Sequence, residues 1–221
     1  MSGFVHLRVH TEFSLEDSLV RIDDLVKSCK GAMMPAVAIT DLGNLYGLVK
    51  FYKAAQGKGV KPVFGADLRV DDGGQVTIVT ALAMNDEGYQ SLIRVISRSF
   101  VDGQRDGVAI VRREWLEAHH AGLILLLGRK SAVGQMLSGS DPGLAVPALR
   151  QWMAAFDDRI YLELQRTSRP GDEAFVHAAV ALATECDCPV VATNDVRFIH
   201  PEDFEAHERS EEHTSELQSQ R

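Results

Sequence analysis

Polar residues that could bind a metal ion follow several short apolar runs in this sequence. The runs and the residues after them are 4–9 with His10, 36–40 with Asp41, 62–66 with Asp67, and 190–193 with Asn194 and Asp195. Strands of barrel and doubly wound folds present functional side chains at their carboxyl ends, so we expect these residues to share one site. Imidazole and carboxylate groups are ligands of divalent metals, and the pattern therefore suggests metal chemistry.

Three positions inside this pattern hold side chains that are not ordinary metal ligands, namely Arg8, Leu42 and Arg197. Arginine carries a permanent positive charge and repels a cation. His6, Arg8 and His10 lie two apart on an expected strand, so all three should point to one face. The two histidines could clamp an ion, or they could be hydrogen-bonded residues at the end of a strand.

The carboxylates of the pattern also have two interpretations. Each could supply oxygen ligands to a metal, and each could instead begin a helix or a turn, since Asp and Asn favour both positions. These residues are Asp17, Asp41, Asp67 and Asp195. Taken singly, each is better explained as a cap.

Composition limits the class of protein. The chain has 221 residues, of which 45% are hydrophobic, and this is enough for a packed α/β domain. A net charge of -8 argues against a surface that coats DNA. No run has the length of a membrane span, so we expect a cytoplasmic protein. Three cysteines without zinc-finger spacing favour reduced thiols, with Cys186 and Cys188 as small buried side chains.

Apolar spacing predicts alternating strands and helices. Helical periodicity covers 22–29, 45–52, 89–96 after the capping pair Asn85 and Asp86, and 173–185, where the apolar face includes Val180. Strand patterns cover 123–127, 160–164 and 190–192, and an antiparallel hairpin is expected around 71–74. The stretch 140–147 is expected to be a surface loop. This order predicts a mostly parallel sheet, open or closed into a barrel.

Other motifs carry less chemistry. His119 and His120 end a short predicted helix and His177 lies on a longer one, so capping and solvent exposure explain all three. Fingerprints of nucleophilic hydrolases, P-loop proteins and dinucleotide-binding proteins do not occur in the sequence.

The segment 4–15 closely resembles the start of the amino-terminal PHP (polymerase and histidinol phosphatase) domain of bacterial DNA polymerase III alpha subunits. Further matching segments are 38–41, 43–47, 61–67, 88–92 and 191–196, and the resemblance covers residues 3–208. It implies an α/β fold, a distorted seven-stranded βα (TIM-like) barrel with metal ligands at the carboxyl ends of its strands.

The resemblance also implies that the metal site has degenerated. Metal-binding members show His-x-His, Asp-His-Gly-Asn, a terminal Glu, and Asn-Asp-Val-His. The vestigial ligands would be His10, Asp17, Asp67 and Asp195, and replaced ligand positions would be Arg8, Leu42, Thr167 and Arg197. We therefore expect no catalytic or cofactor-binding residues and no bound metal in this segment. The arginines are expected to pair with Asp17, Asp67 and Asp195 as a salt-bridged plug.

The function implied by the resemblance is that of a scaffold within a DNA-directed DNA polymerase, a nucleotidyltransferase of DNA replication. Its magnesium-dependent polymerase site would lie downstream. The implied partners are the rest of the alpha chain, the proofreading exonuclease subunit, and DNA through other domains, without a membrane. An alternative is an active phosphoesterase or 3′–5′ exonuclease that uses zinc or manganese, and a third is a bare interaction module.

The final residues, 209–221, resemble a translated sequencing adapter. They contain one strong hydrophobe, Leu217, so we expect them to be solvent-exposed and mobile. The alternative is a genuine acidic tail. The PHP domain would then comprise residues 1–208 and end short of its closing carboxyl-terminal segments.

Overall fold

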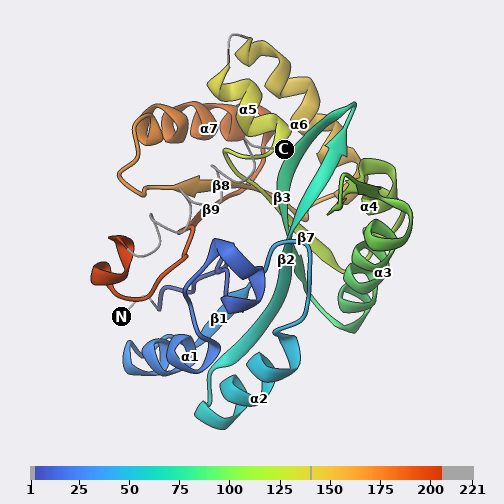
Figure 1. Cartoon of the computed structure of the whole chain (residues 1–221). Helices are drawn as coiled ribbons and strands as arrows, with labels where there is room; N and C mark the ends of the chain where they lie inside the picture. Colours follow the sequence, from blue (N-terminus) through green and yellow to red (C-terminus); the bar gives the residue numbers. More distant parts are fainter. Residues whose placement is uncertain (1–2, 140, 206–221) are drawn as a thin grey trace. The chain divides into compact units, whose positions relative to one another are not determined.

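The structure is a computed structural model that describes residues 3–139 and 141–205 (Figure 1). Its described residues belong to two compact units, one from Met1–Phe64 with Asp195–Arg221 and the other from Gly65–Asn194. The expectations for 209–221 lie outside the described residues. The domain boundary at 208 stays a prediction.

The first unit contains α1 (Ile22–Gly31), β1 (Ala36–Ile39), α2 (Leu48–Lys58) and the start of β2 (Lys61–Asp72). β1 and β2 pair in parallel, from Ala36 with Lys61 to Ile39 with Phe64. The face of α1 predicted from its spacing is buried, and it contributes to a core made of Val9, Val20, Ile22, Leu25, Val26, Cys29, Val37, Ile39, Phe51, Ala55 and Val60. The prediction of an amphipathic helix after the first segment is therefore confirmed.

The second helix buries a different face from the one predicted. Helix α2 begins at Leu48, and its buried residues are Leu48, Phe51 and Ala55. Val49 and Tyr52, which were expected inside, are exposed. Both sets have helical spacing, so packing decides between them, and the ring of Phe51 lies 6.2 Å from that of Phe64 on β2.

The prediction of a strand over residues 4–9 is wrong. Only two isolated bridges form there, His6 with Val37 and Val9 with Val196. The segment forms a few backbone hydrogen bonds with β1 and with the residues around Val196. It then leads into the 3-10 helix η1 (Glu12–Asp17), which Thr11 caps. His6, Arg8 and His10 therefore share no regular strand face.

The second unit contains the rest of β2 with β3 (Gln75–Ala83), β6 (Val111–Arg112), β7 (Leu123–Leu127), β8 (Ile160–Gln165) and β9 (Val190–Thr193). The described strands pair in the order β1-β2-β3-β7-β8-β9, and β6 pairs with β2. A seven-stranded α/β sheet is thus confirmed. Strand β3 is antiparallel to both neighbours, and the other pairs of this sheet are parallel.

The predicted hairpin joins β2 to β3. Asp72 pairs with Gln75, and the turn residues Gly73 and Gly74 have φ of 70° and 96°, which glycine adopts without steric cost. β2 is longer than the apolar run that predicted it. Asp67 consequently lies in the middle of the strand and not at its carboxyl end.

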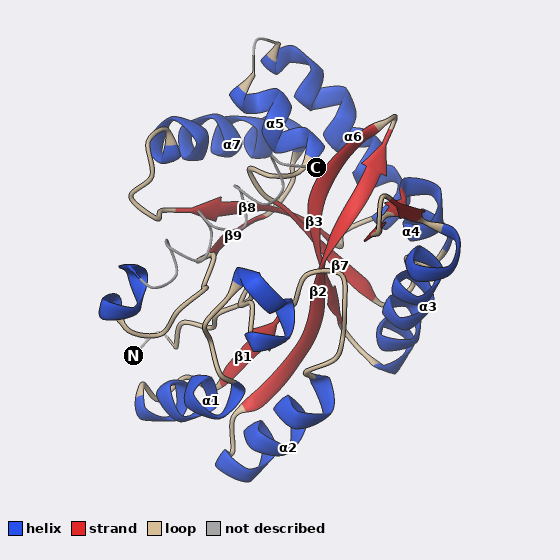
Figure 2. Cartoon of the chain, viewed as in Figure 1, coloured by secondary structure: helices blue, strands red, loops and turns tan. Residues whose placement is uncertain are grey.

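Helices follow most strands of the second unit (Figure 2). They are α3 (Asp86–Asp102), α4 (Arg113–Ala118), α5 (Ala132–Ser138), α6 (Ala145–Phe156) and α7 (Asp172–Cys186). Asn85 caps α3 as predicted. Two details were wrong: Val180 is exposed, and α6 begins at Ala145 after a 3-10 turn (Pro142–Leu144), so the expected loop is shorter. None of the described helices is long and apolar enough to cross a membrane.

The chain also contains a short strand pair and a 3-10 helix near residue 200. β4 (Gln104–Arg105) and β5 (Val108–Ala109) form a separate antiparallel pair. The 3-10 helix η3 (Pro201–Asp203) belongs to the first unit.

Candidate functional site

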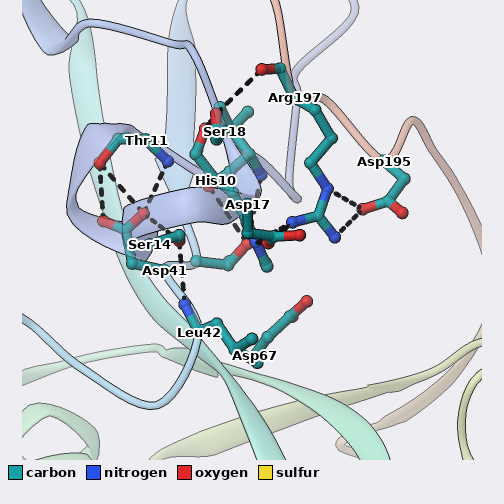
Figure 3. A network of polar contacts seen from close by, with 12 residues as sticks. His10, Thr11, Ser14, Asp17, Ser18, Asp41, Leu42, Asp67, Asp195 and Arg197 are labelled. Carbon is teal, nitrogen blue, oxygen red and sulfur yellow. Dashed lines mark hydrogen bonds and ion pairs between the residues drawn. The ribbon is translucent and has the colours of Figure 1, made fainter. Parts of the chain in front are cut away.

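Three predicted site residues of the first unit meet at one point. The Nη1 atom of Arg197 contacts both Nδ1 of His10 and Oδ2 of Asp17, and those two atoms also contact each other (Figure 3). His10 is fully buried, and the Asp17 side chain is 29% exposed. A guanidinium nitrogen thus lies between an imidazole and a carboxylate that were expected to be metal ligands.

The other side of the same guanidinium binds Asp195. Its Nη2 and Nε atoms lie 2.8 and 3.1 Å from Oδ1 of Asp195. The Nε atom of Arg8 lies 3.8 Å from the same oxygen. Arg8, Asp195 and Arg197 are all at least nine-tenths buried, so this is an interior ion-pair cluster and not a surface one. The predicted pairing of the arginines with Asp17 and Asp195 is confirmed.

A serine that the sequence did not single out joins the segments that carry this cluster. The hydroxyl of Ser18 lies 2.7 Å from the carbonyl oxygen of His10 and 3.0 Å from that of Arg197. The same oxygen accepts a hydrogen bond from the backbone N–H of Val20. Its only signal in the sequence is its position directly after Asp17.

Asp41 anchors Thr11 and Ser14 at the start of η1. It accepts hydrogen bonds from the backbone N–H of Thr11 at 2.6 Å, from the Thr11 hydroxyl, and from the hydroxyl of Ser14 at 2.7 Å. The Ser14 oxygen in turn accepts from the N–H of Leu42. Asp41 and Leu42 therefore hold the start of η1 in place. The interpretation of Asp41 as a residue that begins its own helix or turn is wrong, because its carboxylate binds Thr11 and Ser14, which lie 30 and 27 residues earlier in the chain.

Gly47 lets the loop before α2 pack closely against Phe13 and Ile22. A Cβ atom at Gly47 would lie 2.9 Å from the ring of Phe13 and 3.1 Å from the side chain of Ile22. Asn44 fixes the same turn, because its amide donates to the carbonyl of Phe13 and its oxygen accepts from the N–H of Tyr46.

His6 has a separate environment. Its ring lies edge-on to Phe4 with centroids 5.0 Å apart, and its buried Nδ1 atom has no hydrogen-bond partner within the described part of the chain. Burial lowers the pKa of the imidazole below its ordinary value. His6 is therefore a neutral, half-buried ring at neutral pH.

Two predicted site residues belong to the second unit. The Asp67 carboxylate accepts a hydrogen bond of 2.5 Å from the hydroxyl of Thr80, its partner across β2 and β3. Its pairing with an arginine stays a prediction. Thr167 donates through its N–H and hydroxyl to Asp172, the first residue of α7, at 2.8 and 3.1 Å. Thr167 thus closes the loop before α7.

The surroundings of Asp172 lower the pKa of its carboxyl group. Desolvation alone would raise the pKa of its carboxyl, but hydrogen bonds from Thr167 and Arg169 and the charge of Arg129 outweigh it, so the pKa is lowered. Arg129 lies 3.2 Å away.

A buried glutamate in β8 also escaped sequence reasoning. Glu163 accepts a hydrogen bond of 2.5 Å from the Thr193 hydroxyl, and a Cβ atom at Gly128 would clash with its carboxylate. Glu163 lies inside an apolar run, and its charge within that run is the one sequence signal that could have identified it as a buried polar residue.

Of the histidines and cysteines outside the cluster, His120 and Cys186 differ from the expectation. His120 is half-buried, its Nδ1 atom lies 2.9 Å from Nη2 of Arg159, and its ring centroid lies 5.8 Å from that of Phe156, so neither capping nor solvent exposure explains it. His177 is exposed on α7, and His119 is the residue that ends α4. The cysteines are free thiols, with Cys29 and Cys188 buried and Cys186 half-buried. Over residues 3–139 and 141–205, no group of three or more His, Cys, Asp and Glu side chains is arranged to hold a metal ion.

Comparisons with known proteins agree on the family. The PHP domain model matches residues 6–167. The chain is 53% identical over 211 residues to the DNA polymerase III subunit alpha of Pseudomonas fluorescens, and 47% identical over 209 residues to that of Escherichia coli K12. These matches cover 94% and 93% of this chain, whereas the chain spans only 18% of each relative.

Solved structures of similar fold have little sequence in common with this chain. An amidohydrolase from Chromobacterium violaceum has a TM-score of 0.59 at 11% identity, with 93% of this chain and 96% of that one covered. A putative metal-dependent phosphoesterase from Bifidobacterium adolescentis has a TM-score of 0.56 at 15% identity, with 89% and 88% covered. At such identities these likenesses concern the fold alone.

Proposed function

We propose, on the premise that this chain belongs to the PHP domain family, that it serves as a non-catalytic scaffold in a bacterial DNA polymerase III alpha subunit. Similarity over almost the whole chain to such subunits supports the assignment. The observation that carries the non-catalytic role is the position of Arg197 between His10, Asp17 and Asp195.

The donor set around Arg197 does not fit a metal ion. His10, Asp17 and Asp195 would be the available donors, and the guanidinium of Arg197 contacts all three. A divalent ion placed about 4 Å from one guanidinium would meet a repulsion on the order of 8 kcal/mol at an effective dielectric of about 20. Arg8 beside Asp195 adds to that repulsion. We therefore derive no hydrolytic step for this site.

The cluster has a structural role in this proposal. Arg197 bonds to side chains of the segments that carry His10 and Asp17, and Ser18 links the backbones of the same region. Well-made buried ion pairs fix a geometry even where their net stabilisation is small. The arginines thus hold together segments that a metal would otherwise bridge.

The activities of the complete polymerase are assigned to parts beyond this segment. Magnesium-dependent nucleotidyl transfer, contact with DNA, and the cytoplasmic location follow from the assignment to the alpha subunit. The rest of the alpha chain and the proofreading exonuclease subunit are the proposed partners.

A hydrolysis assay tests the non-catalytic role. The purified chain is incubated with a model phosphodiester and with a 3′-labelled oligonucleotide, in the presence of zinc, manganese or magnesium. We expect no hydrolysis above the level of buffer. Hydrolysis that His10→Ala and Asp195→Ala both remove would establish the alternative, an active phosphoesterase or exonuclease.

A chimera tests the assignment to the polymerase. Residues 3–205 of this chain replace the matching segment of the Pseudomonas fluorescens subunit. We expect primer extension and co-purification of the exonuclease subunit to be retained. A folded chimera that extends primers but no longer retains the exonuclease subunit would contradict the scaffold role.

A further inference from the structure

Helix α2 presents an apolar and aromatic face to solvent. We call Tyr46, Val49, Tyr52, Lys53 and Gln56 the α2 outer face. Tyr46, Val49 and Tyr52 are 64%, 67% and 46% exposed. A turn closed by the hydrogen bond from the N–H of Leu48 to the carbonyl of Leu45 leads from Tyr46 into α2, and Val49 and Lys53 lie at i and i+4 on one side of the helix.

Tyr46, Val49 and Lys53 of this face point away from the residues that build the core, and Tyr52 lies at its edge, with its ring 6.4 Å from that of Phe64. Leu48, Phe51 and Ala55 are buried, so the outward position of Val49 is not an accident of a frayed helix. Isolated exposed hydrophobes are ordinary, but a contiguous group with two tyrosines marks an interaction surface.

The charge of the face is positive and uncompensated. Lys53 has no ion pair or hydrogen bond within the described residues, whereas Lys50 on its flank binds Glu12 at 2.6 Å. Six of the seven lysines of the chain lie between Lys27 and Lys61. The chain as a whole is acidic, with 31 Asp and Glu against 23 Lys and Arg, whereas the charge among the residues of the α2 outer face is the positive one of Lys53.

We propose that the α2 outer face docks an acidic amphipathic segment of a partner protein. Its apolar centre would take the apolar side chains of that segment, and Lys53 would pair with a carboxylate at the rim. Aromatic anchors within a charged rim are typical of protein–protein interfaces. Nucleic acid is less well matched, because phosphate binding draws on clustered cations and gains nothing from a central valine. The inference gives the scaffold role of the proposed function a defined surface.

The test uses the whole chain and three labelled probes in fluorescence anisotropy. The first is a short helical peptide with leucines at i, i+3, i+4 and i+7 and glutamates elsewhere. The second has lysines in place of the glutamates, and the third is an oligothymidylate. We expect the acidic peptide to bind tightest, and Val49→Glu and Lys53→Glu each to weaken it about tenfold or more.

Controls separate the face from general effects. Val101 on α3 is 79% exposed, so Val101→Glu adds the same charge elsewhere and should leave binding unchanged. Thermal melts of Val49→Glu should match those of the parent, because the side chain is already in solvent.

Several outcomes would overturn the inference. One is equal binding of the acidic and lysine peptides, and another is acidic binding that survives Val49→Glu. Loss of oligothymidylate binding in Lys53→Glu, without acidic peptide binding, would assign the face to nucleic acid. A dimer in sedimentation that Val49→Glu dissociates would assign it to a second copy. Metal-dependent hydrolysis would contradict the proposed function and leave the peptide result unaffected, so the two failures are distinguishable.

Discussion

Arg197 binds Asp195, which lies two residues before it in the chain. The Nε and Nη2 atoms of Arg197 both contact the same carboxylate oxygen of Asp195. The remaining terminal nitrogen of the same guanidinium reaches His10 and Asp17. One side chain thus joins three groups that, in metal-binding relatives of the PHP family, are expected to converge on an ion. The positive charge at this point is therefore supplied by the protein and not by a metal ion.

Removal of Arg197 should destabilise the chain strongly. Arg197→Ala leaves the buried carboxylate of Asp195 with a weaker partner, and breaking a buried pair in this way typically costs about 3–5 kcal/mol. Urea unfolding followed by circular dichroism measures the change. Arg150→Ala, at an exposed position on α6, is the matched control and should change stability by less than about 0.5 kcal/mol. Equal effects of the two substitutions would show that the cluster stabilises nothing.

Ser18→Ala should cost about 1–3 kcal/mol, because the carbonyls of His10 and Arg197 and the N–H of Val20 lose a shared buried partner. The same unfolding experiment applies. Ser28→Ala on the exposed side of α1 removes a hydroxyl of the same size and should be nearly neutral. A neutral Ser18→Ala would mean that the hydroxyl is dispensable for joining these segments.

The stability of the chain should fall in alkaline solution, partly through Cys188. Burial raises the pKa of this thiol from 9.0 to about 11, so the unfolded chain ionises first as pH rises. Between about pH 9 and 11 ionisation therefore lowers the free energy of the unfolded state relative to the folded state, and the free energy of unfolding falls. Burial also raises the pKa of Cys29, so some slope remains without Cys188.

Unfolding midpoints of the parent and of Cys188→Ala, measured from about pH 7 to 10.5, check this expectation. The values near pH 7 isolate the packing cost of the substitution. The variant should lose less stability on going to alkaline pH than the parent does. Parallel pH profiles would refute a role for this thiol.

On the acid side, Asp172 should contribute to stability. The pKa of its carboxyl is lowered in the folded state, so its contribution is present above the ordinary carboxyl range and is lost as pH falls through the folded value. Asp172→Asn should flatten the acid limb of the stability profile below about pH 4. Asp158→Asn, at an exposed residue, adds the same amide elsewhere and serves as the control. An acid limb identical to that of the parent would contradict the assignment.

Local sequence patterns predicted an element correctly where only one interpretation of the apolar spacing was possible. The burial of α1 follows its spacing, and the turn between β2 and β3 follows from Gly73 and Gly74. The predicted pairing of the arginines with Asp17 and Asp195 relied on charge and is confirmed, whereas the assignment of vestigial metal ligands stays a prediction. Arginine at positions 8 and 197 cannot coordinate a cation and must find carboxylates once buried, and both do.

The failures have a common physical origin in tertiary packing. Two sets of apolar residues in α2 have helical spacing, and packing against the core buries Phe51 and leaves Val49 exposed. Segment 4–9 has strand composition, but it meets two neighbours only briefly and forms isolated bridges. Ser18 and Glu163 depend on partners more than 25 residues away in the chain, and no local pattern encodes such partners.

Zinc titration calorimetry distinguishes a site blocked by Arg197 from a working metal site. The purified parent chain is compared with the triple variant Arg8→His, Leu42→His and Arg197→His, which restores imidazoles where metal-binding members have them. We predict no measurable zinc binding by the parent and clear binding by the triple variant. Zinc binding by the parent that His10→Ala and Asp17→Ala abolish, or a triple variant that binds no better than the parent, would show that the arginines do not block a metal site.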